Sequence, residues 1–571
     1  MHDYLDMFKV EFTLAFVENF DKVETDIETA LQSADNEECL EEWEKPDKIW
    51  MPKALSLLQN TFKLERFRPL QISAISSIMA NEDCIFIMST GAGKSLIYQM
   101  CALLKDGVTI VVSPLISLIE DQLRSLRKCG IYAATLNQST SQEETKEIMA
   151  ELSKKTDIKL KLLYVTPEKL AKSKRVMNKL DVCAKAGNLA LVAIDEVHCI
   201  SSMGNDFRSD YKFLNILKRQ FGAPILGVSA TLTSNVLRDV KEVLGIPAAL
   251  VFKGNFNREN LVYQVKIKPP SIDEFIDEVV TLINGQFKSQ SGIIYCFSRK
   301  ECEEVASKLC KKGIKSLPYH ANLEGAERSR CHESWSQGKT QVITATIAFG
   351  MGVDKPNIRF VIHHTISKSI ENYYQESGRA GRDGLSAHCI LYFKLTDVFR
   401  LSTMVCTERT GIEHLYGMIQ YTISNDCRRN MASHFNESWD NSWCHQNCCD
   451  NYDKTINPNH TQKNVYQFYE KAVEFIDKEK SKDGRITGNK LLELICKSHK
   501  TEDKLFIEKV VAYLFVEGYL QEDFHFTAYS VISYVKVGTA ASFKGKDRCV
   551  VKYFPKSVQN GQSSRKRKMV E

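Results

Sequence analysis

The segment CIFIMSTGAGKSLIYQM carries residues suited to holding the phosphates of a nucleotide. An apolar run leads into the loop TGAGKS, and a helical pattern follows. Glycines such as Gly91 and Gly93 let backbone N–H groups curl around phosphate oxygens, and Lys94 adds a positive charge to the β- and γ-phosphates. Thr90 belongs to the same loop, and the Ser95 hydroxyl can ligate Mg²⁺. The segment predicts a nucleotide-binding loop between a strand and a helix.

An acidic pair supplies the second half of such a site. The apolar run LALVAID ends at Asp195, and Glu196 follows it directly. Asp195 would hold Mg²⁺ through water, and Glu196 would orient and deprotonate the water that attacks the γ-phosphate. Two acids at a strand end are usually no more than a solvated end, but together with the Lys94 loop they predict nucleotide hydrolysis.

Cations for the transition state are predicted in a third segment, YYQESGRAGRDG. Gln375, Arg379 and Arg382 stand at i, i+4 and i+7, so on a helix they would share one face. Arginines there could reach across a cleft and stabilise the charge that develops on the γ-phosphate. The alternative is a solvated basic helix end, and it is weaker because a second α/β unit surrounds the segment.

Short apolar runs separated by helical patterns fill residues 50–400 and predict the elements that position these groups. They are CIFIM, VTIVVS, LKLLYV, LALVAID and ILGVSA, followed by GIIYCF, QVITATI, FVIHHT and CILYF. Runs that are apolar at every position and alternate with helices are typical of parallel sheets covered on both faces. The predicted fold class is α/β with two lobes, and segment 254–265 is predicted to be the hinge between them.

The bulk composition is that of a globular, intracellular protein. With 571 residues the chain is too long for one core, and 43% apolar and 26% charged residues are ordinary for folded domains. No apolar run approaches the length of a membrane span, so no membrane association is expected. The 18 cysteines are mostly scattered singly, as buried thiols in a reducing compartment are. The net charge of +5 permits a polyanionic partner without arguing for one.

The motifs and their order resemble superfamily 2 helicases and, within them, the RecQ family of DNA helicases. The resemblance spans about 50–540 and includes FRPLQ (67–71), SPLISLIEDQ (113–122), YVTPEKL (164–170), DEVH (195–198), SAT (229–231), PYHANL (318–323), TATIAFGMGVDKP (344–356) and ESGRAGRDG (376–384). It implies a helicase that uses ATP and Mg²⁺, moves 3′ to 5′ on single-stranded DNA, and separates duplex or forked DNA in repair, recombination or replication. The residues that match Arg68 and Gln71 recognise adenine in the family.

The resemblance also implies two RecA-like lobes, a helical zinc-binding subdomain and a winged-helix domain. The expected ranges are an N-terminal extension (1–48), lobe one with the ATP site (49–254), lobe two (255–400), the zinc-binding subdomain (401–460), the winged-helix domain (461–545) and a basic tail (546–571). The chain resembles the short form of the family, for which no HRDC domain is expected, and is most similar to the vertebrate-type short RecQ helicases. The tail contains RKRK at 565–568, which predicts nuclear import or, alternatively, a solvated DNA-adhesive end.

Three cysteines match the spacing of a structural zinc site, which the family has in this region. Cys427 is followed by a 16-residue gap and then by Cys444 and Cys448 as C-x₃-C. The family's last pair reads C-D-x-C, whereas this chain reads CCDNY from Cys448 on. Three thiols without a metal are the alternative. The fourth ligand stays open between Cys449, His445, His434 and none.

A helix rich in Leu, Val and Phe, followed by FHFTAYSVISYV, resembles the winged helix of the family, whose hairpin pries the duplex apart. Tyr529 matches the position whose aromatic ring works at the junction. A ring stacked on the last base pair would compensate for about 1–3 kcal/mol of lost base stacking. An ordinary cross-strand tyrosine in a hydrophobic sheet is the alternative.

The loop after DEVH departs from the family pattern C-I-S-Q-W-G-H-D-F-R-P-D-Y, which senses single-stranded DNA. Phe207 and Arg208 keep the pair that can meet a base. The substituted positions are Ser202, Met203, Asn205 and Ser209. We therefore expect complete ATPase machinery with a weakened DNA sensor.

Three rival functions follow from this. One is an ATP-driven translocase or strand-annealing protein that unwinds weakly, another is an RNA helicase of the wider superfamily, and the third is a DNA-binding scaffold with residual ATPase activity. The preferred DNA structure, the protein partners and the existence of a homo-oligomer stay open.

Met203→Trp combined with Asn205→His should raise both the DNA stimulation of ATP hydrolysis and strand separation, with little change in ATP affinity. An indole offers a rigid flat face for a base, whereas a methionine side chain is flexible. The measurement is hydrolysis with and without single-stranded DNA, at one salt concentration, for parent and variant. A strongly stimulated parent and an unimproved variant would mean that the loop tolerates these changes.

Overall fold

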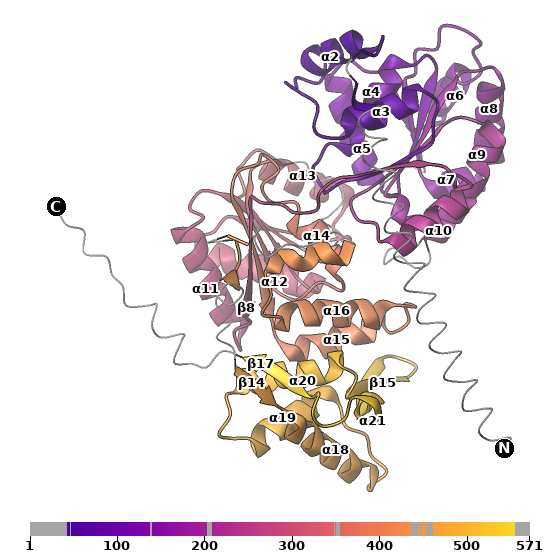
Figure 1. The fold of residues 1–571 in the computed structure, drawn as a ribbon. Coiled ribbons are helices and arrows are strands. Elements are labelled where there is room, and N and C mark those ends of the chain that lie inside the picture. The colour runs from indigo at the N-terminus through magenta and orange to yellow at the C-terminus, as the bar shows by residue number, and fades with distance from the viewer. Residues whose placement is uncertain are drawn as a thin grey trace, which may run out of the picture.

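Two α/β units lie one above the other, with a helical layer and a small C-terminal unit below the second (Figure 1). The computed structural model describes residues 43–45, 47–137, 140–201, 208–347, 349, 355–435, 444–445, 448–452 and 461–553. Most of the expected N-terminal extension, and the RKRK motif of the tail, lie outside these residues. Among the described helices, none combines the length and apolar character needed to span a membrane.

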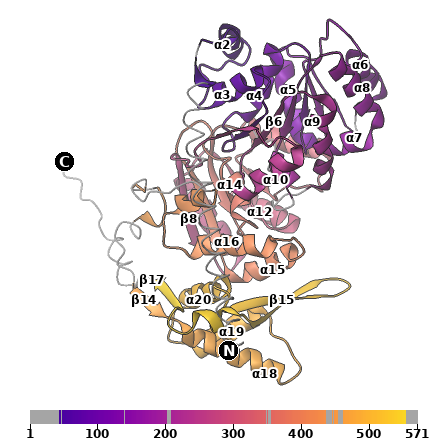
Figure 2. The ribbon, with the colours of Figure 1, turned by 45° about the vertical axis from the view of Figure 1, so that its right-hand side comes forward.

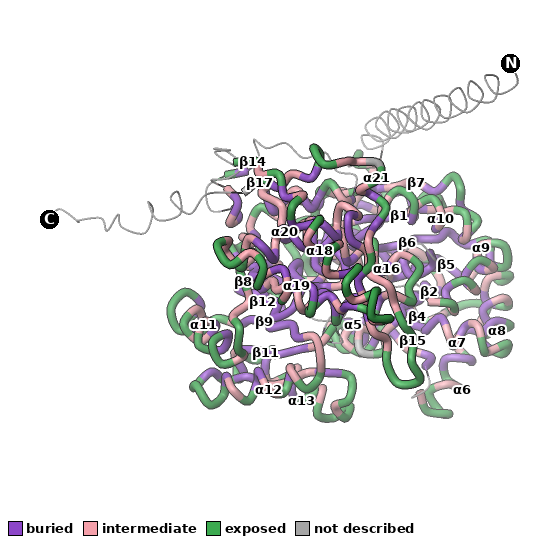
Figure 3. Tube along the Cα trace, turned by 90° about the horizontal axis from the view of Figure 1, so that it is seen from below, coloured by how far each residue is buried: buried purple, intermediate pink, exposed green. Residues whose placement is uncertain are grey.

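The first unit is a seven-stranded parallel sheet in the order β3-β4-β2-β5-β6-β1-β7. Its strands are β1 (Cys84–Ile87), β2 (Val108–Val112), β3 (Ala133–Leu136), β4 (Leu162–Val165), β5 (Leu189–Asp195), β6 (Ile225–Ser229) and β7 (Leu250–Lys253). Its helices are α2 (Met51–Asn60), α3 (Gln71–Met79), α4 (Lys94–Leu104), α5 (Ile116–Lys128), α6 (Gln142–Glu151), α7 (Pro167–Lys172), α8 (Lys174–Lys185), η1 (Val197–Ile200), η2 (Ser209–Leu214), α9 (Asn215–Phe221) and α10 (Ser234–Leu244). The strands β1, β2, β4, β5 and β6 are buried throughout (Figure 3), which confirms the sheet predicted from the apolar runs.

The second unit is a six-stranded parallel sheet in the order β10-β11-β9-β12-β13-β8. Its strands are β8 (Leu261–Ile267), β9 (Ser291–Tyr295), β10 (Ser316–Tyr319), β11 (Val342–Ala345), β12 (Ile358–His363) and β13 (Ala387–Phe393). Its helices are α11 (Ile272–Gly285), α12 (Arg299–Lys311), α13 (Gly325–Ser336) and α14 (Ile370–Ser377). The two sheets together confirm the predicted pair of RecA-like lobes.

The hinge is shorter than the sequence predicted. Strand β8 begins inside segment 254–265 and pairs with β13 along its whole length. Its pattern is only partly buried because it is an edge strand, so it lacks the continuous apolar run by which the central strands were found. The connection between the two sheets is therefore the short stretch 254–260.

Helices and two small sheets complete the chain. Its elements are α15 (Leu395–Val405), α16 (Gly411–Ile423), η3 (Arg428–Phe435), β14 (Thr461–Asn464), α18 (Tyr466–Lys480), α19 (Gly488–Ser498), α20 (Lys504–Val516), β15 (Leu520–Phe526), β16 (Val531–Val537), α21 (Ala540–Lys544) and β17 (Val550–Tyr553). Helix α15 crosses the expected lobe boundary at residue 400. Strand β17 pairs antiparallel with β14, so the start of the predicted tail at 546 was wrong, because VVKY completes a sheet with TQKN.

Candidate functional site

The phosphate loop connects the buried strand β1 to helix α4, as predicted. Gly91 and Gly93 have φ angles of 83° and 82°, in the left-handed region that glycine adopts without steric cost. The Lys94 ammonium folds back over the loop and donates hydrogen bonds to the carbonyls of Met88, at 3.0 Å, and Ser89, at 3.3 Å. The backbone of the loop therefore surrounds the Lys94 ammonium.

Charged side chains from both lobes surround that lysine. Burial lowers the pKa of Lys94, Glu196 and Asp195 oppose the shift, and Arg382 and Arg379 add to it. Burial and the neighbouring Glu196 raise the pKa of Asp195 to about 7. Two adjacent carboxylates in a buried site favour a bound cation, because each disfavours ionisation of the other. The acidic pair therefore fits a hydrated Mg²⁺ ion.

Ser95 lies in the first turn of α4, half-buried. Burial raises the pKa of Tyr98, three residues further along α4, and the charge of Asp195 adds to the shift. Ser95 and Asp195, the two residues predicted to hold Mg²⁺, therefore both lie near Tyr98.

The two residues expected to recognise adenine contact the phosphate loop directly. The Gln71 carbonyl accepts a hydrogen bond from the Arg68 backbone N–H at 2.8 Å, and its amide donates to the carbonyls of Ala92, at 3.3 Å, and Gly93, at 3.0 Å. The Arg68 guanidinium donates to the Gly91 carbonyl. Base-recognition and phosphate-binding groups thus form one connected structure.

The helix predicted to carry three residues of the second lobe ends early. Gln375 lies on α14, but Arg379 and Arg382 lie in the turns that follow it, so the expectation of one shared helical face was wrong. Gly381 has a φ of 58°, which no α-helix continues. The segment is irregular because glycines interrupt it.

Both arginines nonetheless lie at the nucleotide loop. The Cγ and Cδ atoms of Arg382 are each 2.8 Å from where a Cβ on Gly91 would stand, so the side chain packs on the bare glycine. Arg379 is buried, and its positive charge adds to the lowering of the pKa of Lys94. The second lobe brings two cations close to the phosphate loop, as the predicted stabilisation of a phosphoryl-transfer transition state would require.

A series of polar contacts joins the acidic motif to Gln375, and its central member, His198, was not among the predicted site residues. His198 Nδ1 lies 3.3 Å from Glu196 Oε2 and 2.9 Å from Ser229 Oγ. Ser229 Oγ accepts from the Thr231 N–H at 3.2 Å, and the Thr231 hydroxyl accepts from Gln375 Nε2 at 3.4 Å. The spelling DEVH was the signal that could have found His198. This series of contacts connects Glu196, the predicted general base, with the second lobe.

The predicted DNA-contacting residues lie in different surroundings. Phe207 and three of the divergent positions, Ser202, Met203 and Asn205, lie outside the described residues, so the predicted weakening of the sensor stays a prediction. Arg208 Nη1 donates to the Pro114 carbonyl at 3.0 Å. Its guanidinium therefore supports the turn that begins SPLISL.

Tyr529 lies at the tip of the β15–β16 hairpin, which projects from the body of the protein (Figure 2). Its side chain is 100% exposed, and Phe526 beside it is 58% exposed. The alternative of a packed cross-strand tyrosine is therefore wrong. Two aromatic rings held in solvent are available to a partner with flat apolar faces.

The base of this hairpin is fixed by Glu522, which sequence reasoning missed. Its carboxylate accepts hydrogen bonds from the hydroxyls of Ser402 on α15, Tyr416 on α16, at 3.0 Å, and Ser533 on β16. Burial raises the pKa of Glu522, and these donors oppose the shift. The carboxylate fixes the hairpin to the helical layer under the second lobe.

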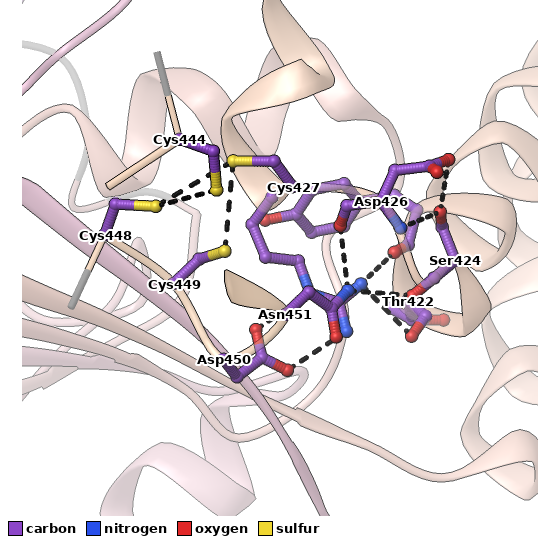
Figure 4. Close-up of polar contacts among 11 residues, drawn as sticks. Thr422, Ser424, Asp426, Cys427, Cys444, Cys448, Cys449, Asp450 and Asn451 are labelled. Atoms are coloured by element: carbon purple, nitrogen blue, oxygen red, sulfur yellow. Dashed lines mark hydrogen bonds and ion pairs between the residues drawn. The ribbon is translucent and has the colours of Figure 1, made fainter. Parts of the chain in front are cut away.

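Four buried cysteine sulfurs meet beside the second lobe (Figure 4). The Sγ atoms of Cys427, Cys444, Cys448 and Cys449 all lie within 4.8 Å of one another. The separations are 3.9 Å between Cys427 and Cys448, 3.4 Å between Cys444 and Cys448, and 3.9 Å between Cys427 and Cys449. Tetrahedral zinc with bonds of about 2.3 Å needs sulfurs about 3.8 Å apart, so the donor set fits zinc.

Cys449 stands where a fourth ligand is needed, and both candidate histidines are engaged elsewhere. His445 Nε2 lies 3.0 Å from Arg429 Nη1. His434 Nε2 lies 2.7 Å from Glu371 Oε1. Adjacent cysteines thus supply two of the four sulfurs.

Two family models match the two lobes: DEAD/DEAH box helicase over residues 68–240, and helicase conserved C-terminal domain over residues 274–384. A Caenorhabditis elegans relative named as an ATP-dependent DNA helicase Q1 is 52% identical over 94% of this chain and 86% of its own length. The Mus musculus ATP-dependent DNA helicase Q1 is 45% identical over 91% of this chain and 82% of its own length. The Xenopus laevis RecQ-like DNA helicase BLM is 37% identical over 85% of this chain and 38% of its own length. The chain belongs to the RecQ family of ATP-dependent DNA helicases.

A solved structure agrees with the fold of this RecQ helicase. The DUF1998 helicase MrfA, bound to DNA and AMPPNP, is 17% identical, with a TM-score of 0.51 over 66% of this chain and 57% of that one. At this identity the likeness concerns the fold alone.

Lys94→Ala should lower DNA-stimulated ATP hydrolysis at least about 100-fold, because it removes the cation that faces the β- and γ-phosphates. The control is Lys105→Ala, since Lys105 follows the far end of α4 and bonds to Ile78 and Asn81. Hydrolysis near the parental rate in Lys94→Ala would refute the assignment of the loop.

The purified protein should carry about one zinc ion per chain, and Cys449→Ser should reduce that content and lower the Tm. The control is Cys496→Ser, because Cys496 lies on α19, away from the cluster. Zinc is measured by elemental analysis. Full zinc content in Cys449→Ser would show that another group is the fourth ligand.

Proposed function

We propose that this RecQ helicase hydrolyses ATP where its two lobes meet and uses the reaction to move 3′ to 5′ along single-stranded DNA. The observation that carries the proposal is the convergence of Arg379 and Arg382 from the second lobe on Lys94 and the acidic pair of the first. An ATP site shared between two lobes couples hydrolysis to their opening and closing. Such a cycle moves a protein along a strand.

Each side chain has a distinct task in this reaction. Lys94 and Arg382 neutralise the phosphate oxygens, and Glu196, held by His198, orients the attacking water and accepts its proton. When bound at Ser95 and Asp195, Mg²⁺ supplies charge neutralisation for the phosphates. Gln375 is linked through Thr231 to the same network, so its position responds to the state of the acidic motif.

We propose that the hairpin separates the strands. The exposed Tyr529 ring stacks on the terminal base pair while the lobes pull one strand of a fork past it. Zinc held by the four cysteines would stabilise the segment between the second lobe and the hairpin domain.

We propose that the protein works in the nucleus, on DNA under repair, recombination or replication. The support is the RKRK motif at 565–568 together with the family membership. Nuclear exclusion of the full-length chain would overturn the first part.

The discriminating experiment measures ATP hydrolysis with single-stranded DNA and with RNA, beside displacement of a strand from a fork with a 3′ tail and from one with a 5′ tail. The proposal expects DNA stimulation and displacement on the 3′ tail. Stimulation of hydrolysis by DNA without strand displacement would favour a translocase. Stimulation by RNA would favour an RNA helicase. Absence of both stimulation and displacement would favour a DNA-binding scaffold.

Tyr529→Ala should reduce strand displacement at least about 10-fold and leave single-strand-stimulated hydrolysis within about 2-fold, because the ring acts only at the junction. Glu522→Ala should act in the same direction by loosening the base of the hairpin. The control is Tyr132→Ala, an exposed tyrosine of the first lobe. Equal losses of both activities would contradict a junction role.

A further inference from the structure

The connection between the two sheets carries a guanidinium that contacts both halves of the ATP site. Arg258 Nη1 lies 3.4 Å from the carbonyl oxygen of Thr90 in the phosphate loop and 3.4 Å from that of Gly378. Its Nη2 donates to the carbonyls of Ala380, at 3.1 Å, and Gly381, at 3.0 Å. Four backbone carbonyls from two lobes converge on one side chain.

Three of those carbonyls, of Gly378, Ala380 and Gly381, belong to the irregular segment that carries the two arginines. Helix α14 ends before it, so its backbone lacks the regular hydrogen bonds of a helix. Asn260 Nδ2 also donates to the carbonyls of Gly381, at 2.8 Å, and Leu385, at 2.9 Å. A Cβ on Gly381 would stand 2.4 Å from that amide, so the approach requires glycine. The hinge, and not a helix, holds the backbone of this segment.

The hinge is itself fixed from its other side. Phe256 stacks on Phe435 of η3 with ring centroids 4.8 Å apart and an interplanar angle of 15°. The Tyr374 hydroxyl donates to the Phe256 carbonyl at 2.9 Å, and Arg429 of η3 donates to the Glu259 carbonyl. Contacts on both sides therefore fix the backbone from which Arg258 extends, so its guanidinium has a defined position relative to both lobes.

We propose that Arg258 is a positioning residue for ATP hydrolysis: it holds segment 378–382 so that Arg379 and Arg382 meet the phosphate loop. This inference rests on the proposed role of these two arginines. Arg258 acts through backbone carbonyls and touches no reacting atom. Its bond to Thr90 makes the placement of the arginines depend on closure of the lobes. A planar fork of donors can serve several carbonyls at once, whereas a lysine ammonium on a flexible stem cannot hold them in one geometry.

Arg258→Lys keeps the charge and removes the fork. It should lower kcat for DNA-stimulated hydrolysis about 10- to 100-fold, since a displacement of about 1 Å at the reacting groups costs that much. The KM for ATP should stay within about 3-fold and the Tm should be unchanged, because the phosphate loop and the core are intact. The control is Arg238→Lys, an exposed arginine of α10 that bonds only to Asn235 among the described contacts.

A double-mutant cycle distinguishes positioning from general destabilisation. In an Arg382→Ala background, Arg258→Lys should cause a smaller loss than it does in the parent, because one of the two groups that it positions is already gone. Asn260→Ala, which loses only the bonds to the second-lobe segment, should behave in the same non-additive way, even if Arg258→Lys lowers the Tm.

Parental kcat in Arg258→Lys, or losses that multiply in either double variant, would overturn the inference and leave the proposed function intact. Parental hydrolysis in Arg382→Ala alone would instead refute the arginine finger on which both rest. The two failures are therefore separable.

Discussion

The ammonium of Lys94 is partly buried, and burial by itself favours its neutral form. The carboxylates of Asp195 and Glu196 offset this cost, and Arg379 and Arg382 then add positive charge from the other lobe. A site that holds several charges in a desolvated space is suited to a polyphosphate and its cation, because these complete the balance. The two sheets and the segment that joins them bring these charges together.

Parallel sheets provide the rigid part of that arrangement. Strand β1 leads into the phosphate loop, β5 ends at Asp195 and β6 ends at Ser229, so three motifs meet at one edge of one sheet. The arginines have no such support, because they follow the end of α14. The hinge supplies it through hydrogen bonds to backbone carbonyls, so that the second lobe is tied to the first beside the reacting groups.

The cysteine cluster belongs to the same framework. The backbone N–H of Tyr263 on β8 donates to the Cys448 carbonyl at 3.2 Å, and the Tyr263 carbonyl accepts from the Asp450 N–H at 3.1 Å. The cluster is thereby attached to the edge strand that begins directly after the hinge. Glu522 makes an equivalent attachment for the hairpin, so its exposed ring keeps a defined direction relative to the second lobe. Rigid attachment at both places would let motion of the lobes reach the DNA junction at which we propose that Tyr529 acts.

The sequence alone determined the two α/β lobes, the phosphate loop and the acidic pair, because burial on both faces and phosphate chemistry each impose a local pattern of residue types. It also determined that cysteines gather near 427–449. Only the tertiary structure decided that β8 is a strand, that α14 ends before Arg379, and that Cys449 and not a histidine joins the cluster. Arg258 and Glu522 emerged in the same way, since each acts on groups more than 100 residues away in sequence. No local pattern records such partners, because the free energy of a buried hydrogen bond depends on which distant groups the fold brings within reach.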